Sequence, residues 1–400
     1  MLLFFIIYII FLINIQFLLR NIFLGSPGDQ YFVFYNPYFF TKNVAIESLF
    51  FVVLCTFSLI FGYLFSRRCQ VKTYEYNYVR RKSRAVLLLN LTLSLHVILS
   101  AYILIISGDG YGAITETKKS LNFLYELRAI PLLLLCHILL NSPPKDWLNI
   151  SRSRITIALI LTYGVLSILL QARSIVFELF ICFAFSWLKW NNDKIKAVYI
   201  ILLVVALVVP NILVLFRFRE SGIDLDFIID NIFSIEYSVI FNNVLGSAIE
   251  NTHSYLLGAT FLGNLVMVIP SPIRSLIGLD TISVDIYREI AQAGGVYGGG
   301  FSLFAEMYIN FGWASPVGFL FIGMLLGKIV SRSFSKQGIS IYLTCAPLVY
   351  SAFILVLRND MGVFIKYVVQ LYILCLLIDI LLRLKLSVSH NLQAKLKLGV

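Results

Sequence analysis

The residues best suited to chemistry lie in a glycine-rich segment and in the helix that the sequence predicts after it. Five glycines stand among the seven residues of 294–300, with Tyr297 between them. Glycine lets a backbone approach a ligand closely and present its N–H groups to an anion. Glu306, Tyr308 and Asn310 follow, and Glu306 and Asn310 share a helical face because they are four residues apart. Carboxylate, amide and aromatic rings together suit the binding of a sugar. The alternative is an aromatic belt at headgroup level with a helix-capping acid.

A second candidate set consists of the arginines that are predicted to lie at the outer face of the membrane. Arginine binds two phosphate oxygens at once and keeps its charge in a poorly hydrated site. Arg173 and Arg358 each precede an apolar run, and the free N–H groups at a helix start also favour an anion. We therefore predict that these arginines bind a polyanionic headgroup; the alternative is snorkelling or pairing with nearby acids. The set comprises Arg173, Arg217, Arg219, Arg274, Arg288 and Arg358.

Three side chains are candidates for a general base. His253 is the only histidine in the segments predicted to lie on the extracytoplasmic side, and histidine titrates near neutral pH without much tuning. Glu306 and Asp360 are the other two, although Asp360 could instead cap the helix that follows it. Within predicted spans, Glu178 and Lys366 could pair with each other or with the nearby arginines.

The composition excludes a soluble protein. Hydrophobic residues make up 59% of the 400 residues and charged residues only 13%, whereas a soluble domain is about 25% charged. The net charge of +11 arises from Lys and Arg spread among apolar runs. This distribution is typical of charges that orient membrane spans, and it does not indicate nucleic-acid binding. The six cysteines form no CxxC pair, so neither a metal ribbon nor a disulfide framework is expected.

The elements that position these residues are predicted to be transmembrane helices, because a span needs about 20 apolar residues. We expect an all-α integral membrane protein of about ten spans. They lie near 2–19, 44–65, 85–107, 122–141, 155–171, 174–190, 197–216, 311–330, 339–357 and 361–382. The seven cations of 66–84 indicate a cytoplasmic segment, and alternation from there puts both termini inside and the arginine set outside.

Four parts of the chain follow from this topology. Residues 1–216 form a bundle of seven spans, and 217–310 form a large extracytoplasmic loop. Residues 311–382 hold three further spans, and 383–400 form a cytoplasmic tail. Apolar residues recur at helical spacing within the loop, which predicts amphipathic or re-entrant helices at the outer leaflet.

Several motifs resemble those of bacterial O-antigen and oligosaccharide-repeat-unit polymerases of the Wzy type. The main one is GGGFSLFAEMYINFGW at 298–313. Arg173 in a short outer turn, FRFRE at 216–220, Gly258 through Pro272, and Arg358-Asn359-Asp360 also fit. The resemblance covers the architecture from about residue 155 to 382.

The resemblance implies an enzyme of the bacterial cytoplasmic (inner) membrane whose active face is periplasmic. Such an enzyme transfers a growing glycan from undecaprenyl diphosphate to the non-reducing end of a lipid-linked repeat unit, with no cofactor and no metal. Arg173 and Arg358 would neutralise the diphosphate, with Glu306, His253 or Asp360 as base. Substrate contacts would come from Arg217, Arg219, Arg274, Arg288, Tyr297, Tyr308 and Asn310. The expected partners are undecaprenyl-diphosphate-linked oligosaccharide, the lipid bilayer and a chain-length regulator, without nucleic acid.

Three other functions fit parts of the same pattern. An O-antigen ligase also takes glycan from undecaprenyl diphosphate and differs in its acceptor. A lipid-linked oligosaccharide flippase or other transporter is disfavoured because the chain shows no repeated halves. A structural membrane protein would have little use for so many outer arginines.

Overall fold

The computed structural model describes most of the helical part of the chain. The described residues are 2–15, 18–19, 22–23, 41–67, 82–107, 114, 117, 121, 127–144, 154–170, 173–191, 237–250, 255–266, 268–269, 276–278, 302–334, 339–357 and 361–383. These residues form helices and no strand. The predicted all-α class is confirmed for this part of the chain.

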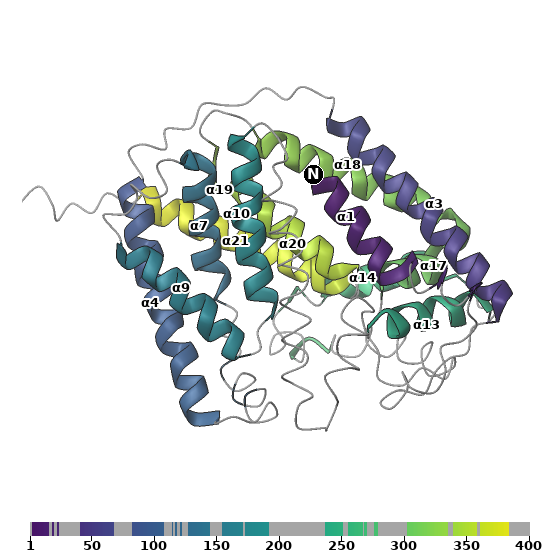
Figure 1. The fold of residues 1–400 in the computed structure, drawn as a ribbon, viewed down its shortest axis with the longest axis horizontal. Coiled ribbons are helices and arrows are strands. Elements are labelled where there is room, and N and C mark those ends of the chain that lie inside the picture. Colours follow the sequence, from purple (N-terminus) through teal and green to yellow (C-terminus); the bar gives the residue numbers. More distant parts are fainter. Residues whose placement is uncertain are drawn as a thin grey trace, which may run out of the picture.

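The first half of the chain contributes seven elements to the described structure (Figure 1). They are α1 (Leu2–Ile10), η1 (Phe11–Ile15), α3 (Lys42–Arg67), α4 (Lys82–Ser107), α7 (Ala129–Asn141), α9 (Arg154–Leu169) and α10 (Arg173–Trp190). The remainder contributes α13 (Tyr237–Glu250), α14 (Ala259–Val266), α17 (Leu303–Phe311), η6 (Gly312–Ala314), α18 (Ser315–Ser333), α19 (Ile341–Thr344), α20 (Ala346–Val356) and α21 (Met361–Arg383).

Four described helices are long and apolar enough to cross a membrane. They run over Lys42–Ser66, Ser83–Ser107, Leu303–Ser333 and Met361–Arg383. Shorter apolar helices cover Ala129–Asn141, Ile155–Leu169 and Ile341–Val356. The chain is therefore a multi-pass membrane protein, while the count of ten spans stays a prediction. The predicted span 197–216 lies outside the described residues.

Three helix boundaries differ from the sequence prediction, and prolines or a cap explain them. The span predicted from residue 122 becomes helix α7 only at Ala129, with Pro131 in the first turn, where a missing N–H costs little. The span predicted over 339–357 breaks at Cys345, because Pro347 cannot donate the next helical hydrogen bond. The span predicted over 311–330 becomes α18, which begins at Ser315 with Pro316 in its first turn. A separate helix, α17, precedes it from Leu303, where Ser302 caps the first turn.

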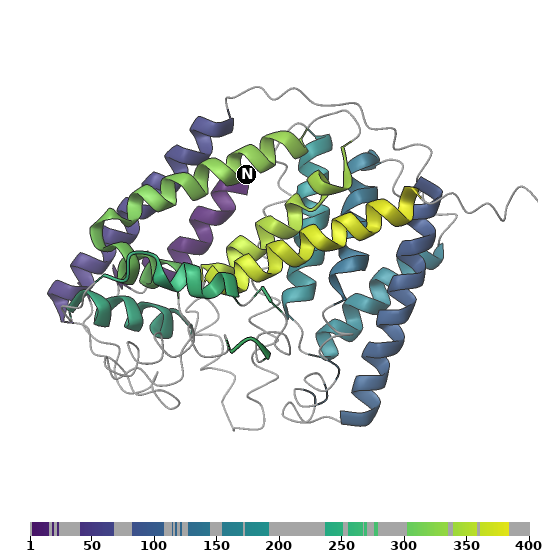
Figure 2. The ribbon, with the colours of Figure 1, turned by 180° about the vertical axis from the view of Figure 1, so that it is seen from behind.

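Helices α3 and α18 run side by side in parallel at the closest helix–helix approach in the described structure (Figures 1 and 2). Glycines make this approach possible: a Cβ on Gly62 or Gly323 would overlap the backbone of the facing helix. A Cβ on Gly327 would lie 2.5 Å from the carbonyl oxygen of Tyr63. Gly323 and Gly327 form a GxxxG pair, which lets membrane helices pack backbone against backbone. The Ser66 hydroxyl donates to the carbonyl oxygen of Met324 at 2.6 Å and closes the same contact.

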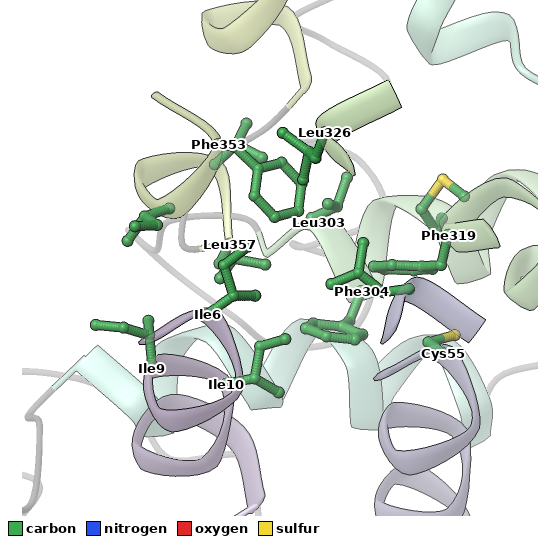
Figure 3. Packing of buried hydrophobic residues seen from close by; sticks show 14 of the residues in the cluster. Ile6, Ile9, Ile10, Cys55, Leu303, Phe304, Phe319, Leu326, Phe353 and Leu357 are labelled. Atoms are coloured by element: carbon green, nitrogen blue, oxygen red, sulfur yellow. The ribbon is translucent and has the colours of Figure 1, made fainter. Parts of the chain in front are cut away.

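The core beneath this pair joins the first helix to the last third of the chain. Ile6 and Ile10 of α1 point towards Leu303 and Phe304 of α17 and towards Leu357 after α20 (Figure 3). The rings of Phe304 and Phe319 stack with centroids 4.9 Å apart. A second core fills the space among α4, α7, α9, α10 and α21, with α7 buried on nearly all sides.

Hydrogen bonds between helices show how α7, α10 and α21 are oriented relative to one another. The Lys189 ammonium and the Trp190 indole at the end of α10 donate to Leu140 and Leu139 carbonyl oxygens at the end of α7, at 2.6 and 3.1 Å. The hydroxyl of Tyr367, in the first half of α21, donates to Glu178, in the first half of α10, at 3.3 Å. Helices α7 and α10 therefore end on the same side, and α10 and α21 contact each other near their starts.

Candidate functional site

Helix α17 carries the polar residues that the sequence singled out. Ser302 caps it, with its hydroxyl accepting from the N–H of Ala305 at 3.2 Å. The helix stops at Gly312, whose φ of +53° lies in the left-handed region that favours glycine. A Cβ there would overlap the Tyr255 ring, so the glycine also makes room for the segment that begins at Tyr255. Glu306 and Asn310 lie between these two ends.

The side chain of Glu306 is fully buried and joins three helices. Its Oε1 accepts from the hydroxyl of Thr260 in α14 at 3.0 Å. Its Oε2 accepts from the backbone N–H of Met361, the first residue of α21, at 2.6 Å. Figure 2 shows α14 lying beside the start of α21, where this carboxylate joins them. Burial of a carboxylate requires such donors, because an unpaired one would be costly.

Asn310 is also fully buried and fixes the turn that leads into α14. Its Nδ2 donates to Thr260 Oγ1 at 2.6 Å and to the Glu306 carbonyl oxygen at 2.8 Å. Its Oδ1 accepts from the Gly258 N–H at 3.0 Å. We call Gly258, Thr260, Glu306, Asn310 and Met361 the Glu306 network.

Backbone hydrogen bonds add to this docking. The N–H groups of Leu256 and Leu257 donate to the carbonyl oxygens of Ile309 and Asn310, at 3.2 and 3.0 Å. Leu257 and Gly258 both have positive φ, of 47° and 89°, so the chain reverses sharply here. The segment that begins at Tyr255 is therefore tied to α17 by its main chain as well as by side chains.

An aromatic cluster lies beside the network. The Tyr308 ring is largely buried and meets Phe51 edge-on, with centroids 5.1 Å apart. Trp313 and Tyr255 follow at 6.1 and 6.3 Å from Tyr308. Tyr255 and Trp313 remain 46% and 43% exposed. Tyr308 and Trp313, two of the predicted aromatic residues, thus meet Tyr255, which the sequence did not single out, and the rings of Trp313 and Tyr255 stay partly exposed.

The structure describes only part of the predicted site. Glu306, Tyr308 and Asn310 come together, whereas of Arg173 only the backbone is described, as the first residue of α10. The remaining predicted residues lie outside the described part of the chain, so their convergence stays a prediction. They are Arg217, Arg219, His253, Arg274, Arg288, Tyr297, Arg358 and Asp360.

The structure also corrects the predicted pairing of Glu178 with Lys366. The hydroxyl of Tyr367 donates to Glu178, whereas the neighbouring Lys366 side chain is exposed. A one-residue step on a helix turns the side chain by about 100°, which separates these two faces. The alternative pairing of Glu178 with Arg173 or Arg358 stays a prediction. Thr260 was missed altogether, because its only sequence signal is a polar residue in an otherwise apolar run. No three His, Cys, Asp or Glu residues within the described ranges gather as metal ligands would.

The chain that contains the Glu306 network matches one known protein family. The family model described as O-antigen polysaccharide polymerase Wzy matches residues 1–388. The chain belongs to the O-antigen polysaccharide polymerase Wzy family. No curated protein and no solved structure matches the chain.

Family membership confirms the resemblance and extends it over the first 150 residues of the polymerase, which the motifs had left as spans only. The chain is an O-antigen polymerase of polysaccharide biosynthesis that acts on lipid-linked oligosaccharide in a membrane. Nothing in the comparison favours a ligase or a flippase. The Glu306 network is therefore part of a polymerase.

Proposed function

We propose that this polymerase transfers a growing glycan from undecaprenyl diphosphate to the non-reducing end of a lipid-linked repeat unit, at the periplasmic face of the inner membrane. The leaving group is a lipid diphosphate, and the bond broken joins it to the sugar C1. Charge that develops on the diphosphate as this bond breaks has to be met by cations already in place. The outer arginines supply these cations.

One contact supports this proposal most directly. Glu178 and Tyr367 bring α10 and α21 together near their starts. Glu178 is five residues, about 7.5 Å of helix, from Arg173, and Tyr367 is about 9 Å from Met361. Arg358 precedes Met361 by three residues. Helices α10 and α21 are thus neighbours near their starts, and the two principal arginines stand at or just before these starts in the sequence.

The acceptor hydroxyl needs a base, for which Glu306, His253 and Asp360 were the candidates. The Glu306 carboxylate already accepts from Thr260 and Met361, which leaves it poorly placed to take a proton from a substrate. The geometry therefore favours His253 and Asp360. Arg217, Arg219, Arg274, Arg288, Tyr297, Tyr308 and Asn310 complete the proposed substrate contacts.

The proposed topology follows the predicted one. Residues 1–216 form seven spans, 217–310 an outer loop, 311–382 three spans, and 383–400 a tail, with both termini in the cytoplasm. Helices α13 and α14 belong to the proposed loop, and α14 contacts the start of α21. This contact supports a position of the proposed loop beside the proposed diphosphate site. A chain-length regulator is the proposed protein partner.

Purified polymerase and synthetic lipid-linked repeat unit test the proposal. The wild type is expected to form polymer without an energy source, whereas Arg173→Ala and Arg358→Ala form little. Arg173→Lys keeps the charge but loses the two-point fork, so we expect it to recover only part of the activity. Wild-type chain lengths from a well-expressed Arg173→Ala would remove that residue from the site. Label that crosses the bilayer without a new glycosidic bond would indicate a flippase, and transfer to lipid A core would indicate a ligase.

Metal independence is tested in the same reaction. Asp224 and Asp226 stand two residues apart in the outer segment, and carboxylate oxygens are ligands that Mg²⁺ and Mn²⁺ prefer. We expect polymerisation to continue in EDTA. Loss of activity in EDTA, restored by Mg²⁺ or Mn²⁺, would contradict this part of the proposal.

A further inference from the structure

The carboxylate of Glu306 sits where a helix start needs an acceptor. The first N–H groups of an α-helix have no partner within the helix, and the helix dipole favours a negative group beside them. Glu306 Oε2 meets this need at the first residue of α21, 2.6 Å from the Met361 nitrogen. A hydrogen bond this short is typical of an ionised acceptor. The acid caps a helix that follows it by 55 residues in the sequence.

The same side chain holds the outer segment in place. Thr260, the second residue of α14, donates to Glu306 Oε1 and accepts from Asn310. Both Glu306 and Asn310 belong to α17, so Thr260 forms hydrogen bonds with two successive turns of one helix. Removing any member leaves a buried donor or acceptor without its partner, which is costly. The three helices α14, α17 and α21 therefore share one connected set of hydrogen bonds.

This arrangement has a consequence for Arg358-Asn359-Asp360, which ends immediately before Met361 in the sequence. The point at which this tripeptide joins α21 is the point that Glu306 holds. Resting on the proposed function of Arg358 and Asp360, we propose that Glu306 is a positioning residue of the polymerase. Its carboxylate fixes the start of α21 against α14 and α17, and so sets the position from which Arg358 and Asp360 act.

The experiment compares Glu306→Gln and Thr260→Val with the wild type and with Glu250→Gln. Glu250 is an exposed glutamate at the end of α13, which makes it a matched control for the same chemical change. Both test variants keep the size of the side chain and remove part of the network. Hydrogen exchange of the full-length protein in detergent is followed in a peptide that contains Met361. Polymerisation of lipid-linked repeat unit is measured in parallel, with kcat, KM and the pH profile.

We expect both test variants to exchange the Met361 amide roughly tenfold faster, as loss of one buried hydrogen bond predicts, and Glu250→Gln to leave it unchanged. We also expect kcat to fall roughly tenfold with KM and the acidic limb of the pH profile retained. The double variant should lose little more than either single one, because both act through the same contacts.

Three results would overturn the proposal. The first is exchange at Met361 that matches the wild type in both variants, and the second is a wild-type kcat despite faster exchange. The third is loss of the acidic limb in Glu306→Gln with a kcat lower by about 100-fold or more, while Thr260→Val stays active, because that pattern belongs to a general base. If the wild type itself forms no polymer, the proposed function fails, whereas the exchange result still decides whether Glu306 holds α21.

Discussion

Replacing Gly323 with alanine tests the packing of α3 against α18. A Cβ at this position would overlap the Leu59 carbonyl group, and the equivalent atom on Gly327 would lie 2.5 Å from the Tyr63 oxygen. Ordinary van der Waals contact begins at 3.4 Å, so the two helices would have to separate by about 1 Å. Lipid gives membrane helices little hydrophobic reason to associate, and close packing supplies much of the attraction instead.

The expected cost of Gly323→Ala is about 1–3 kcal/mol of stability, the usual range for overpacking. Gly164 in α9 is the matched control, since a Cβ there meets nothing within 4 Å. Alanine at Gly164 should instead stabilise its helix by about 0.5–1 kcal/mol, because glycine is a poor helix former.

Thermal unfolding in detergent, followed by the loss of monodisperse protein, measures both variants. The melting temperature should fall for Gly323→Ala and stay level or rise for Gly164→Ala. A second measurement uses Gly62→Ala, which places a methyl group in the same contact from α3. The double variant with Gly323→Ala should lose less stability than the sum of the two single losses. Equal melting temperatures for Gly323→Ala and the wild type would refute the close approach of α3 and α18.

Two further predictions concern contacts that α7 makes with the rest of the protein. Asn141 exchanges hydrogen bonds with the backbone of Ile339 at 2.8 and 3.2 Å, so Asn141→Ala should destabilise the protein by about 1–3 kcal/mol. Asn191→Ala removes only a local hydrogen bond to the Trp187 carbonyl oxygen at the end of α10. Its loss of stability, measured by thermal unfolding in parallel, should be smaller. The Sγ atoms of Cys136 and Cys182 are 2.9 Å apart, so iodine should cross-link α7 to α10 in a protein with its other cysteines replaced. Fragments that separate without reductant after cleavage between these helices would contradict the α7–α10 contact.

Much of the helical framework was predictable because hydropathy reports the bilayer directly. The apolar runs at 44–65 and 85–107 appear as α3 and α4 with nearly the predicted bounds. The helix that carries Glu306 and Asn310 was predicted from their spacing and appears as α17. Its start at Leu303 is set by the Ser302 cap, which hydropathy does not report.

The candidate site was predictable only as far as local spacing reaches. Glu306 and Asn310 do share a face of α17, as their separation of four residues indicated. Their partners Thr260 and Met361 lie about 50 residues away in opposite directions along the chain, and no local pattern connects them. Of the three interpretations of Glu306 as sugar ligand, general base or helix-capping acid, the helix-capping acid fits the geometry, although the helix that it caps is α21 rather than its own.

The turn at Leu256 and Leu257 is held to α17 by main-chain groups, whose hydrogen bonds do not depend on which side chains stand there. The side chains of Tyr255 and Leu257 are partly exposed at this turn, with 46% and 80% of their surface accessible. Substitutions at these two positions can alter the exposed surface of the turn while its backbone hydrogen bonds to α17 persist. The exposed face of this turn can thus change in evolution while the backbone hydrogen bonds that hold it persist.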